Sequence, residues 1–155
     1  LGVNKHLWPV LHRHRFAYDT SRTAKPGAQP KKIEHDLWEF PLAYIPFAGS
    51  PTSSVLSMDY NFYYKQSKAR DTATRGTPLW DQYYQETLTS YREYFRKNEQ
   101  GNRAPVFIGH HFSLWNDGAY WEAMKTFATE TCGQPHVKCV SYKELMEELE
   151  KYTSE

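Results

Sequence analysis

The densest group of chemically versatile side chains in this 155-residue chain lies between residues 109 and 117, with the sequence Gly-His-His-Phe-Ser-Leu-Trp-Asn-Asp. It directly follows residues 106–108, Val-Phe-Ile, a short apolar run that is typical of a strand buried on both faces. A histidine at the end of such a strand is well placed as a general acid or base, because its pKa lies near neutrality. Side chains alternate along an extended segment, so one of His110 and His111 is expected to point into a cleft and the other away. In the alternative interpretation, one imidazole satisfies a buried backbone group and the other is solvated.

Asp59 is the candidate partner of these imidazoles, because it also follows an apolar run, at residues 55–58. A carboxylate beside an imidazole fixes the tautomer of the ring and raises its pKa. If the two predicted strands are neighbours, Asp59 can orient His110 in this way. An aspartate at the end of a strand also commonly caps a turn. The sequence leaves both interpretations open.

Other catalytic centres find little support in the sequence. A complete metal site within the chain is not expected, since adjacent histidines diverge and the chain has no HxxxH, HExxH or paired CxxC motif. Ser113 lacks the GxSxG context of a nucleophile elbow, and no glycine-rich phosphate loop is present. Cys132 and Cys139 are separated by a short loop, so a disulfide and a pair of free thiols are both possible.

The elements expected to position these residues fall into a loop-rich first half and a more regular second half. In the first half, hydrophobic spacing and breaker residues predict a helix at 5–15, strands at 16–18 and 55–58, an extended segment at 37–45, a loop from Asp59 and a polar surface loop at 65–76.

In the second half, Thr77 and Pro78 are typical of a helix start, and aromatic residues at three- and four-residue steps continue the helix to near Gly101. The other predicted elements are a strand at 106–108, a helix at about 118–132 capped by Asp117, a strand at 137–140 and a final helix with a capping box at Ser141 and Glu144. This alternation favours an α/β fold with parallel strands and crossover helices. The working groups of such folds lie at the carboxyl ends of the strands.

Aromatic residues make up 16% of the chain, and twelve of them are tyrosines. Tyrosine combines a flat apolar face with a polar tip, which suits a sugar-binding cleft, but the same rings can build a core. The rings at helical spacing are most simply core: Trp80, Tyr84, Tyr91 and Phe95. Nineteen basic against eighteen acidic residues argue against a nucleic-acid groove or a polybasic membrane patch. No apolar run approaches the ~20 residues that span a bilayer, so no transmembrane segment is expected.

Residues 103–145 resemble the C-terminal part of the polysaccharide deacetylases, the NodB-homology family, through the stretches RAPVFIGHHFSLWNDGAYW and CGQPHVKCVSYKEL. The segments FAYDTS and LSMDYNFY are similar to middle segments of the same family. These enzymes are metal-dependent hydrolases that remove N- or O-acetyl groups from glycans. The resemblance therefore implies that residues 1–155 are the C-terminal part of a distorted (β/α)7 barrel, and that an acetylated glycan is the partner.

The resemblance also implies roles for individual residues, because Ile-Gly-His at 108–110 matches the family motif of a small aliphatic residue, any residue and histidine. His110 would be the general acid that protonates the leaving amine or alcohol, and Asp59 its orienting partner. The residues implied around the substrate are Ile108 in the acetyl pocket, and Trp115 and Tyr60 as sugar-facing rings, with Trp115 favoured.

The early motifs of the family have no counterpart here, namely the catalytic-base aspartate, a metal-ligand aspartate and two histidines in an HxxxH arrangement. A divalent metal, zinc by resemblance, is thus expected in the full-length family but not on this chain. We expect the N-terminal metal-binding half to be missing and the chain alone to be inactive. The alternative is a non-catalytic glycan-binding module or a degenerate relative. The family acts on envelope and extracellular polymers, which implies a secreted, periplasmic or cell-envelope location.

Overall fold

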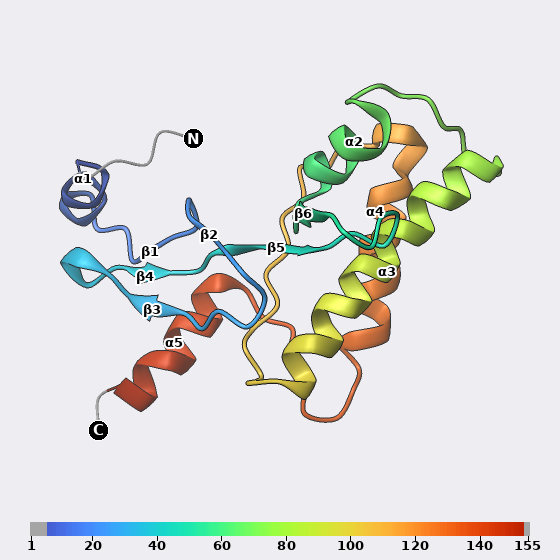
Figure 1. The fold of residues 1–155 in the computed structure, drawn as a ribbon. Coiled ribbons are helices and arrows are strands. Elements are labelled where there is room, and N and C mark those ends of the chain that lie inside the picture. The colour runs from blue at the N-terminus through green and yellow to red at the C-terminus, as the bar shows by residue number, and fades with distance from the viewer. Residues whose placement is uncertain (1–5, 154–155) are drawn as a thin grey trace.

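The computed structural model describes residues 6–153 and shows a mixed α/β fold. The elements of the first half are α1 (Leu7–Arg13), β1 (Tyr18–Asp19), β2 (Thr23–Ala24), β3 (Lys31–Lys32), a short 3-10 helix (Glu34–Asp36), β4 (Trp38–Glu39), β5 (Leu42–Pro46) and β6 (Ser54–Leu56). The predicted helix at 5–15 is α1, with residue 5 outside the described residues. The helices that follow are α2 (Asp59–Ser67), α3 (Pro78–Gln100), α4 (Trp115–Thr131) and α5 (Tyr142–Thr153). In Figure 1, β5 connects the end that holds α1, the short strands and α5 to the end that holds α2, α3 and α4.

The helix starts predicted for α3 and α5 are confirmed. At the start of α3, the Thr77 hydroxyl accepts a hydrogen bond from the Trp80 backbone N–H at 3.3 Å, and Pro78 occupies the first helical position. At the start of α5, the Ser141 backbone N–H donates to the Glu144 carboxylate at 2.7 Å, and the Glu144 N–H donates to the Ser141 hydroxyl at 3.3 Å. Both caps satisfy N–H groups that a helix terminus leaves without a partner.

The strands form two three-stranded sheets of mixed direction. In one, β4 pairs parallel with β1 and antiparallel with β3. In the other, β5 pairs parallel with β2 and antiparallel with β6. Only Phe40 and Pro41 separate β4 from β5, so the extended segment predicted at 37–45 supplies the central strand of both sheets. Pro41 lies between the two strands, where its missing N–H costs no ladder bond.

No barrel is seen in the part of the chain that the structure describes, and the strands predicted at 106–108 and 137–140 are wrong. A strand needs paired neighbours for its backbone groups, and here the pairing is reduced to one isolated parallel bridge between Met58 and Gly109. The loop predicted from Asp59 is also wrong. That segment is α2, which is held by the burial of Phe62 and Tyr63 rather than by a helical pattern in the sequence.

The start of α4 differs from the prediction as well. Residues 116–118 have left-handed φ angles of 49°, 51° and 79° inside the assigned helix. Asp117 therefore does not cap the helix, and its carboxylate instead accepts a hydrogen bond from the Arg75 backbone N–H at 2.9 Å. Gly118 tolerates this backbone conformation because it has no Cβ. The result is a sharp entry into α4 directly after the segment that carries the histidines.

The largest core cluster lies between β5, α2, α3 and α4, and Tyr91 and Tyr120 are completely or almost completely buried in it. A second cluster joins Trp38 and Phe40 to Tyr142 at the start of α5. The rings predicted as core do contribute to buried clusters, namely Trp80, Tyr84, Tyr91 and Phe95. The aromatic excess of the sequence is thus largely a structural feature of the helices.

A disulfide joins Cys132 to Cys139, with a Cα–Cα distance of 5.3 Å. It closes the loop that leads from the end of α4 towards α5. Of the two possibilities that the sequence left open, the structure has the bonded pair. The bridge ties the irregular segment at 137–140 to the end of a long helix, although no sheet holds that segment.

Candidate functional site

Backbone hydrogen bonds bring the segments around Asp59 and Gly109 together, although 50 residues separate them. The Gly109 N–H donates to the Ser57 carbonyl at 2.9 Å, and the Asp59 N–H donates to the Gly109 carbonyl at 3.1 Å. The Ser57 hydroxyl adds a bond to the Phe107 carbonyl at 2.7 Å. Asp59 begins α2, and the histidines directly follow Gly109. The sequence left open whether these segments are neighbours, and the structure brings them together through a bridge rather than a continuous sheet.

The Asp59 side chain is buried and bound by several donors. Its Oδ1 accepts from the Tyr60 backbone N–H at 2.7 Å and from His111 Nδ1 at 2.6 Å. Its Oδ2 accepts from the His111 backbone N–H at 2.8 Å. His111 therefore binds Asp59 through both its ring and its backbone.

His110 lies on the other side of the same carboxylate. Its Nδ1 is 3.6 Å from Asp59 Oδ2, which is beyond hydrogen-bond distance, and its Nε2 is 3.1 Å from the Tyr91 hydroxyl. The sequence pairs Asp59 with His110, but the hydrogen bond in the structure is with His111. The two rings differ in exposure, since the His110 side chain is 8% exposed and that of His111 is 49% exposed, but both approach the same carboxylate rather than pointing to opposite sides.

Burial sets the protonation of His110 and Tyr91. Desolvation lowers the pKa of His110; the nearby His111 lowers it further, while the Asp59 carboxylate opposes both effects. Tyr91 is completely buried, so desolvation raises its pKa strongly, and the charge of Asp59 acts in the same direction. The phenol thus keeps its proton, and His110 favours its neutral form.

Two rings, Tyr60 and Trp115, border the imidazole of His111, and a third, Tyr63, packs against both of them. Trp115 lies parallel to Tyr63, with ring centroids 4.9 Å apart, and Tyr60 meets Trp115 edge-on at 5.5 Å. The His111 ring is 5.6 Å from Trp115. The structure thus brings Trp115 and Tyr60 to the site, as predicted. However, Tyr63 covers one face of Trp115, so that only the remaining surface of this ring can meet a ligand.

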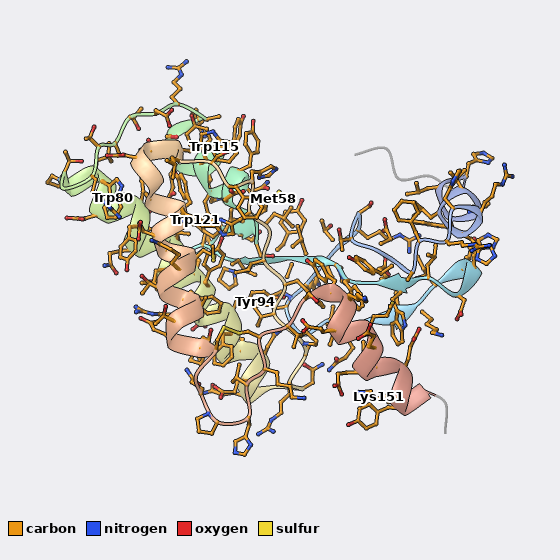
Figure 2. All side chains as sticks on the ribbon, turned by 180° about the vertical axis from the view of Figure 1, so that it is seen from behind. Met58, Trp80, Tyr94, Trp115, Trp121 and Lys151 are labelled. Carbon is orange, nitrogen blue, oxygen red and sulfur yellow. A yellow bond between two sulfur atoms is a disulfide. The ribbon has the colours of Figure 1, made fainter. Side chains whose placement is uncertain are left out.

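Two exposed apolar side chains in the same segment were not singled out from the sequence. Phe112 is 83% exposed and Leu114 is 71% exposed, on either side of Ser113. Phe112 has a left-handed φ of 55° and its ring is 5.7 Å from that of Trp121, which in turn lies 6.2 Å from His110. In Figure 2, Trp115 and Trp121 lie along α4. The signal for Phe112 was its place beside the histidines, but the sequence does not show which rings of the loop stay exposed.

Asn116 was also missed, and it fixes the loop that carries the site. It is fully buried, and its Oδ1 accepts from the backbone N–H groups of Thr72 at 2.7 Å and Ala73 at 3.1 Å. Its Nδ2 donates to the hydroxyls of Ser67 at 3.2 Å and Tyr120 at 2.9 Å. One amide therefore joins α2, the 71–73 loop and α4. The left-handed backbone at Asn116 suits an asparagine better than most residues.

Ile108, implied as an acetyl-pocket residue, does not lie beside Asp59 and His111. It packs against the main core and lines a cavity of about 830 Å³ between the ends of α3 and α4, the disulfide loop and α5. Asp59, His110 and His111 do not line this cavity. This cavity is therefore separate from the carboxylate–imidazole cluster, and we regard the cluster as the candidate site because it holds the groups capable of proton transfer.

Within residues 6–153, no three His, Cys, Asp or Glu side chains gather in a way that could hold a metal ion. None of the helices in that range is long and apolar enough to cross a membrane. No family model, no curated protein and no solved structure matches the chain. The candidate site consequently rests on its geometry: a buried carboxylate, two imidazoles of different exposure and a border of aromatic rings.

Proposed function

We propose that this chain is the C-terminal portion of a metal-dependent hydrolase that removes N- or O-acetyl groups from a polysaccharide. The observation that carries the proposal is the hydrogen bond of 2.6 Å between the buried Asp59 carboxylate and the half-exposed imidazole of His111. A carboxylate on one ring nitrogen makes the other nitrogen a better proton acceptor and stabilises the imidazolium. Such a pair beside exposed rings suits acid–base chemistry on a sugar.

The chemistry assigned to this cluster is protonation of the leaving group. When the tetrahedral intermediate of deacetylation collapses, the bond from the acyl carbon to the sugar nitrogen or oxygen breaks. An imidazolium gives its proton to that departing atom and becomes a neutral imidazole, and acetate and the free amine or alcohol are released. Proton transfer by a positioned side chain contributes about 10²–10⁴-fold to the rate.

The resemblance assigns this acid role to His110, but the geometry favours His111. Nε2 of His110 is occupied by the Tyr91 hydroxyl, and its ring is almost fully buried. Nδ1 of His111 is held by Asp59, and no residue of the described chain hydrogen-bonds its Nε2. That nitrogen is the one that a leaving group can reach, with Asp59 as the orienting residue.

The metal of the proposed reaction does not fit this chain. The described residues offer no group of three ligands, so we derive no step through a metal ion here. Zinc, the base that activates water and the strands that complete a distorted (β/α)7 barrel would belong to a missing N-terminal half. The chain alone is therefore expected to be inactive. A secreted, periplasmic or cell-envelope location is supported by the Cys132–Cys139 disulfide, since such bonds persist in oxidising compartments.

The second candidate is a non-catalytic glycan-binding module. The exposed rings next to the site favour it, because Tyr60 is 44% exposed and Phe112 83%. Sugars stack on such rings, and this contact needs neither a metal nor a base. Both candidates require glycan binding at the same surface, but only the first requires a proton donor there.

Glycan binding by the 155-residue chain tests what the two candidates share. An N-acetylated chito-oligosaccharide is titrated into labelled protein, and shifts of backbone amide signals are followed by NMR. We expect saturable shifts at residues 109–117. Phe112→Ala should weaken binding, whereas Tyr152→Ala removes a ring that is 76% exposed on α5 and should not. Figure 2 shows Lys151, the neighbour of Tyr152, near the end of α5 and far from Trp115. Absence of binding, or equal losses in both variants, would overturn the proposal.

Acetate release separates the two candidates. The chain alone, with zinc added, should release no acetate from the same oligosaccharide, and measurable release would show that it needs no second half. In a longer form that carries the metal and base, His111→Gln should lower kcat by about 10²–10⁴-fold while metal content stays unchanged. An unchanged kcat would refute the acid role of His111 and leave glycan binding as the only role proposed for this cluster.

A further inference from the structure

Tyr91 is a buried residue of α3, and its hydroxyl group hydrogen-bonds a histidine of the candidate site. Its hydroxyl is 3.1 Å from Nε2 of His110, and the whole residue is buried within the main core. His110 in turn stands between this hydroxyl and Asp59, whose Oδ2 is 3.6 Å from His110 Nδ1. The order of groups is therefore phenol, buried imidazole, carboxylate and half-exposed imidazole.

Only one arrangement of protons satisfies this row of groups. If the Tyr91 hydroxyl donates to His110 Nε2, the proton of the neutral imidazole is on Nδ1 and faces the Asp59 carboxylate. In the opposite tautomer, the lone pair of Nδ1 faces a negative oxygen. The Tyr91 O–H then also lacks an acceptor, because the structure gives this hydroxyl no other hydrogen-bond partner among the described residues. A buried donor without an acceptor is costly, so the first arrangement is favoured.

The surroundings of His110 also disfavour a second proton on its ring. The Asp59 carboxylate hydrogen-bonds the ring and the backbone N–H of His111, at 2.6 and 2.8 Å, whereas its distance to His110 Nδ1 is 3.6 Å. The His110 side chain is 8% exposed, so water does not solvate a charge there. A proton on Nε2 would also turn Tyr91 from donor to acceptor and leave its O–H without an acceptor among the described residues.

We propose that Tyr91 is a positioning residue that holds His110 neutral, with its proton on Nδ1 facing Asp59, so that of the two rings only His111 is left to exchange a proton with a ligand. The value of this arrangement for catalysis rests on the proposed function. The tautomer of His110 does not, because it follows from contacts within the chain. Tyr91 itself touches no substrate and acts through His110.

The ring nitrogens can be observed directly, without a substrate, in protein labelled with ¹⁵N at histidine. The four ring signals of His110 and His111 are followed from about pH 5 to pH 8, the range over which histidine normally titrates. In the wild type, His110 should keep a protonated Nδ1 and a bare Nε2 over most of this range. A His110 that carries its proton on Nε2, or that is protonated on both nitrogens near neutral pH, would overturn the proposal without any variant.

Tyr91→Phe removes only the hydroxyl and provides the second test. The population ratio of the two His110 tautomers should move by about fivefold towards the Nε2-protonated form, which corresponds to one ordinary hydrogen bond. The matched control is Tyr94→Phe, since Tyr94 is buried on the same helix but its hydroxyl contacts the Phe107 N–H at 3.4 Å instead of a histidine. An unchanged ratio in Tyr91→Phe, or an equal change in the control, contradicts the role of Tyr91. Neither result depends on glycan binding, so failure of the two proposals can be distinguished.

Discussion

Replacement of Asn116 by leucine should destabilise the protein more than almost any other single change of similar size. The amide is fully buried and makes four hydrogen bonds of 2.7–3.2 Å, two as acceptor from backbone N–H groups and two as donor to hydroxyls. Leucine has a similar volume, so no large cavity results. The loss of stability therefore comes from the missing hydrogen bonds and from the left-handed backbone, which leucine adopts less readily than asparagine.

The magnitude follows from the individual contacts. The Ala73 N–H is buried and loses its acceptor, at about 2 kcal/mol, while the more exposed Thr72 N–H can find water and costs about 1 kcal/mol. The bonds to Ser67 and Tyr120 together add about 1 kcal/mol. The left-handed φ of 49° at this position adds about 1 kcal/mol for a leucine. The sum is a loss of about 5 kcal/mol in the free energy of unfolding.

Urea unfolding followed by circular dichroism measures this loss, with Asn61→Leu as the control. Asn61 lies on α2, is half-buried, and its side chain makes no hydrogen bond to the described residues, so the same exchange should cost less than about 1 kcal/mol there. Because whole domains are stable by only about 5–15 kcal/mol, Asn116→Leu should be close to unfolded at room temperature. Losses that agree within about 1 kcal/mol for the two variants would refute the view that this amide fixes the site loop.

Two further outcomes are expected for the whole chain. Reduction of the Cys132–Cys139 disulfide, or its replacement by two serines, should lower the free energy of unfolding by about 2–3 kcal/mol, because the bridge closes a short loop; an unchanged urea midpoint after reduction would contradict this. The lowered pKa of buried His110 means that the folded state binds its proton less readily than the unfolded state, so this contribution to stability is complete above about pH 6.5 and is lost as the pH falls. Unfolding curves between about pH 5 and pH 7 should therefore depend less on pH in His110→Gln than in the wild type, and equal slopes would argue against the shift.

The predictable parts of the fold are those encoded locally. Thr77 with Pro78, and Ser141 with Glu144, determine where α3 and α5 begin, and the structure shows the expected cap hydrogen bonds in both places. The ring spacing along α3 also identified buried residues, because a helix repeats its face every three to four positions. These signals require only neighbours in sequence.

The strands at 106–108 and 137–140 could not be predicted in the same way. An apolar run identifies a segment that would be stable in a sheet, but pairing depends on residues far away, and here Gly109 alone finds a partner in Met58. Conversely, α2 has no clear helical pattern, and its burial against the core determines its structure. In both cases tertiary contacts outweighed the local pattern.

The sequence indicated which residues belong to the candidate site, but not which of them hydrogen-bond one another. Alternation predicted that the two imidazoles would have different environments, but it did not say that His110 is the buried one and His111 the half-exposed one. It also did not identify His111 as the ring bonded to Asp59, since that depends on the His111 backbone N–H donating to the same carboxylate. Nor could it reveal Tyr91, which reaches His110 from a helix that the sequence indicated only as core.

The bridge between Met58 and Gly109 also affects how long the candidate site stays assembled. Backbone hydrogen bonds from the Gly109 and Asp59 N–H groups hold the histidine segment beside α2, together with the two bonds from His111 to the Asp59 carboxylate. When all of these open, the carboxylate and the imidazoles separate, and the same event exposes the two amides to solvent. Deuterium exchange at the Gly109 and Asp59 amides therefore sets an upper limit on the fraction of time for which the cluster is apart while the rest of the molecule stays folded.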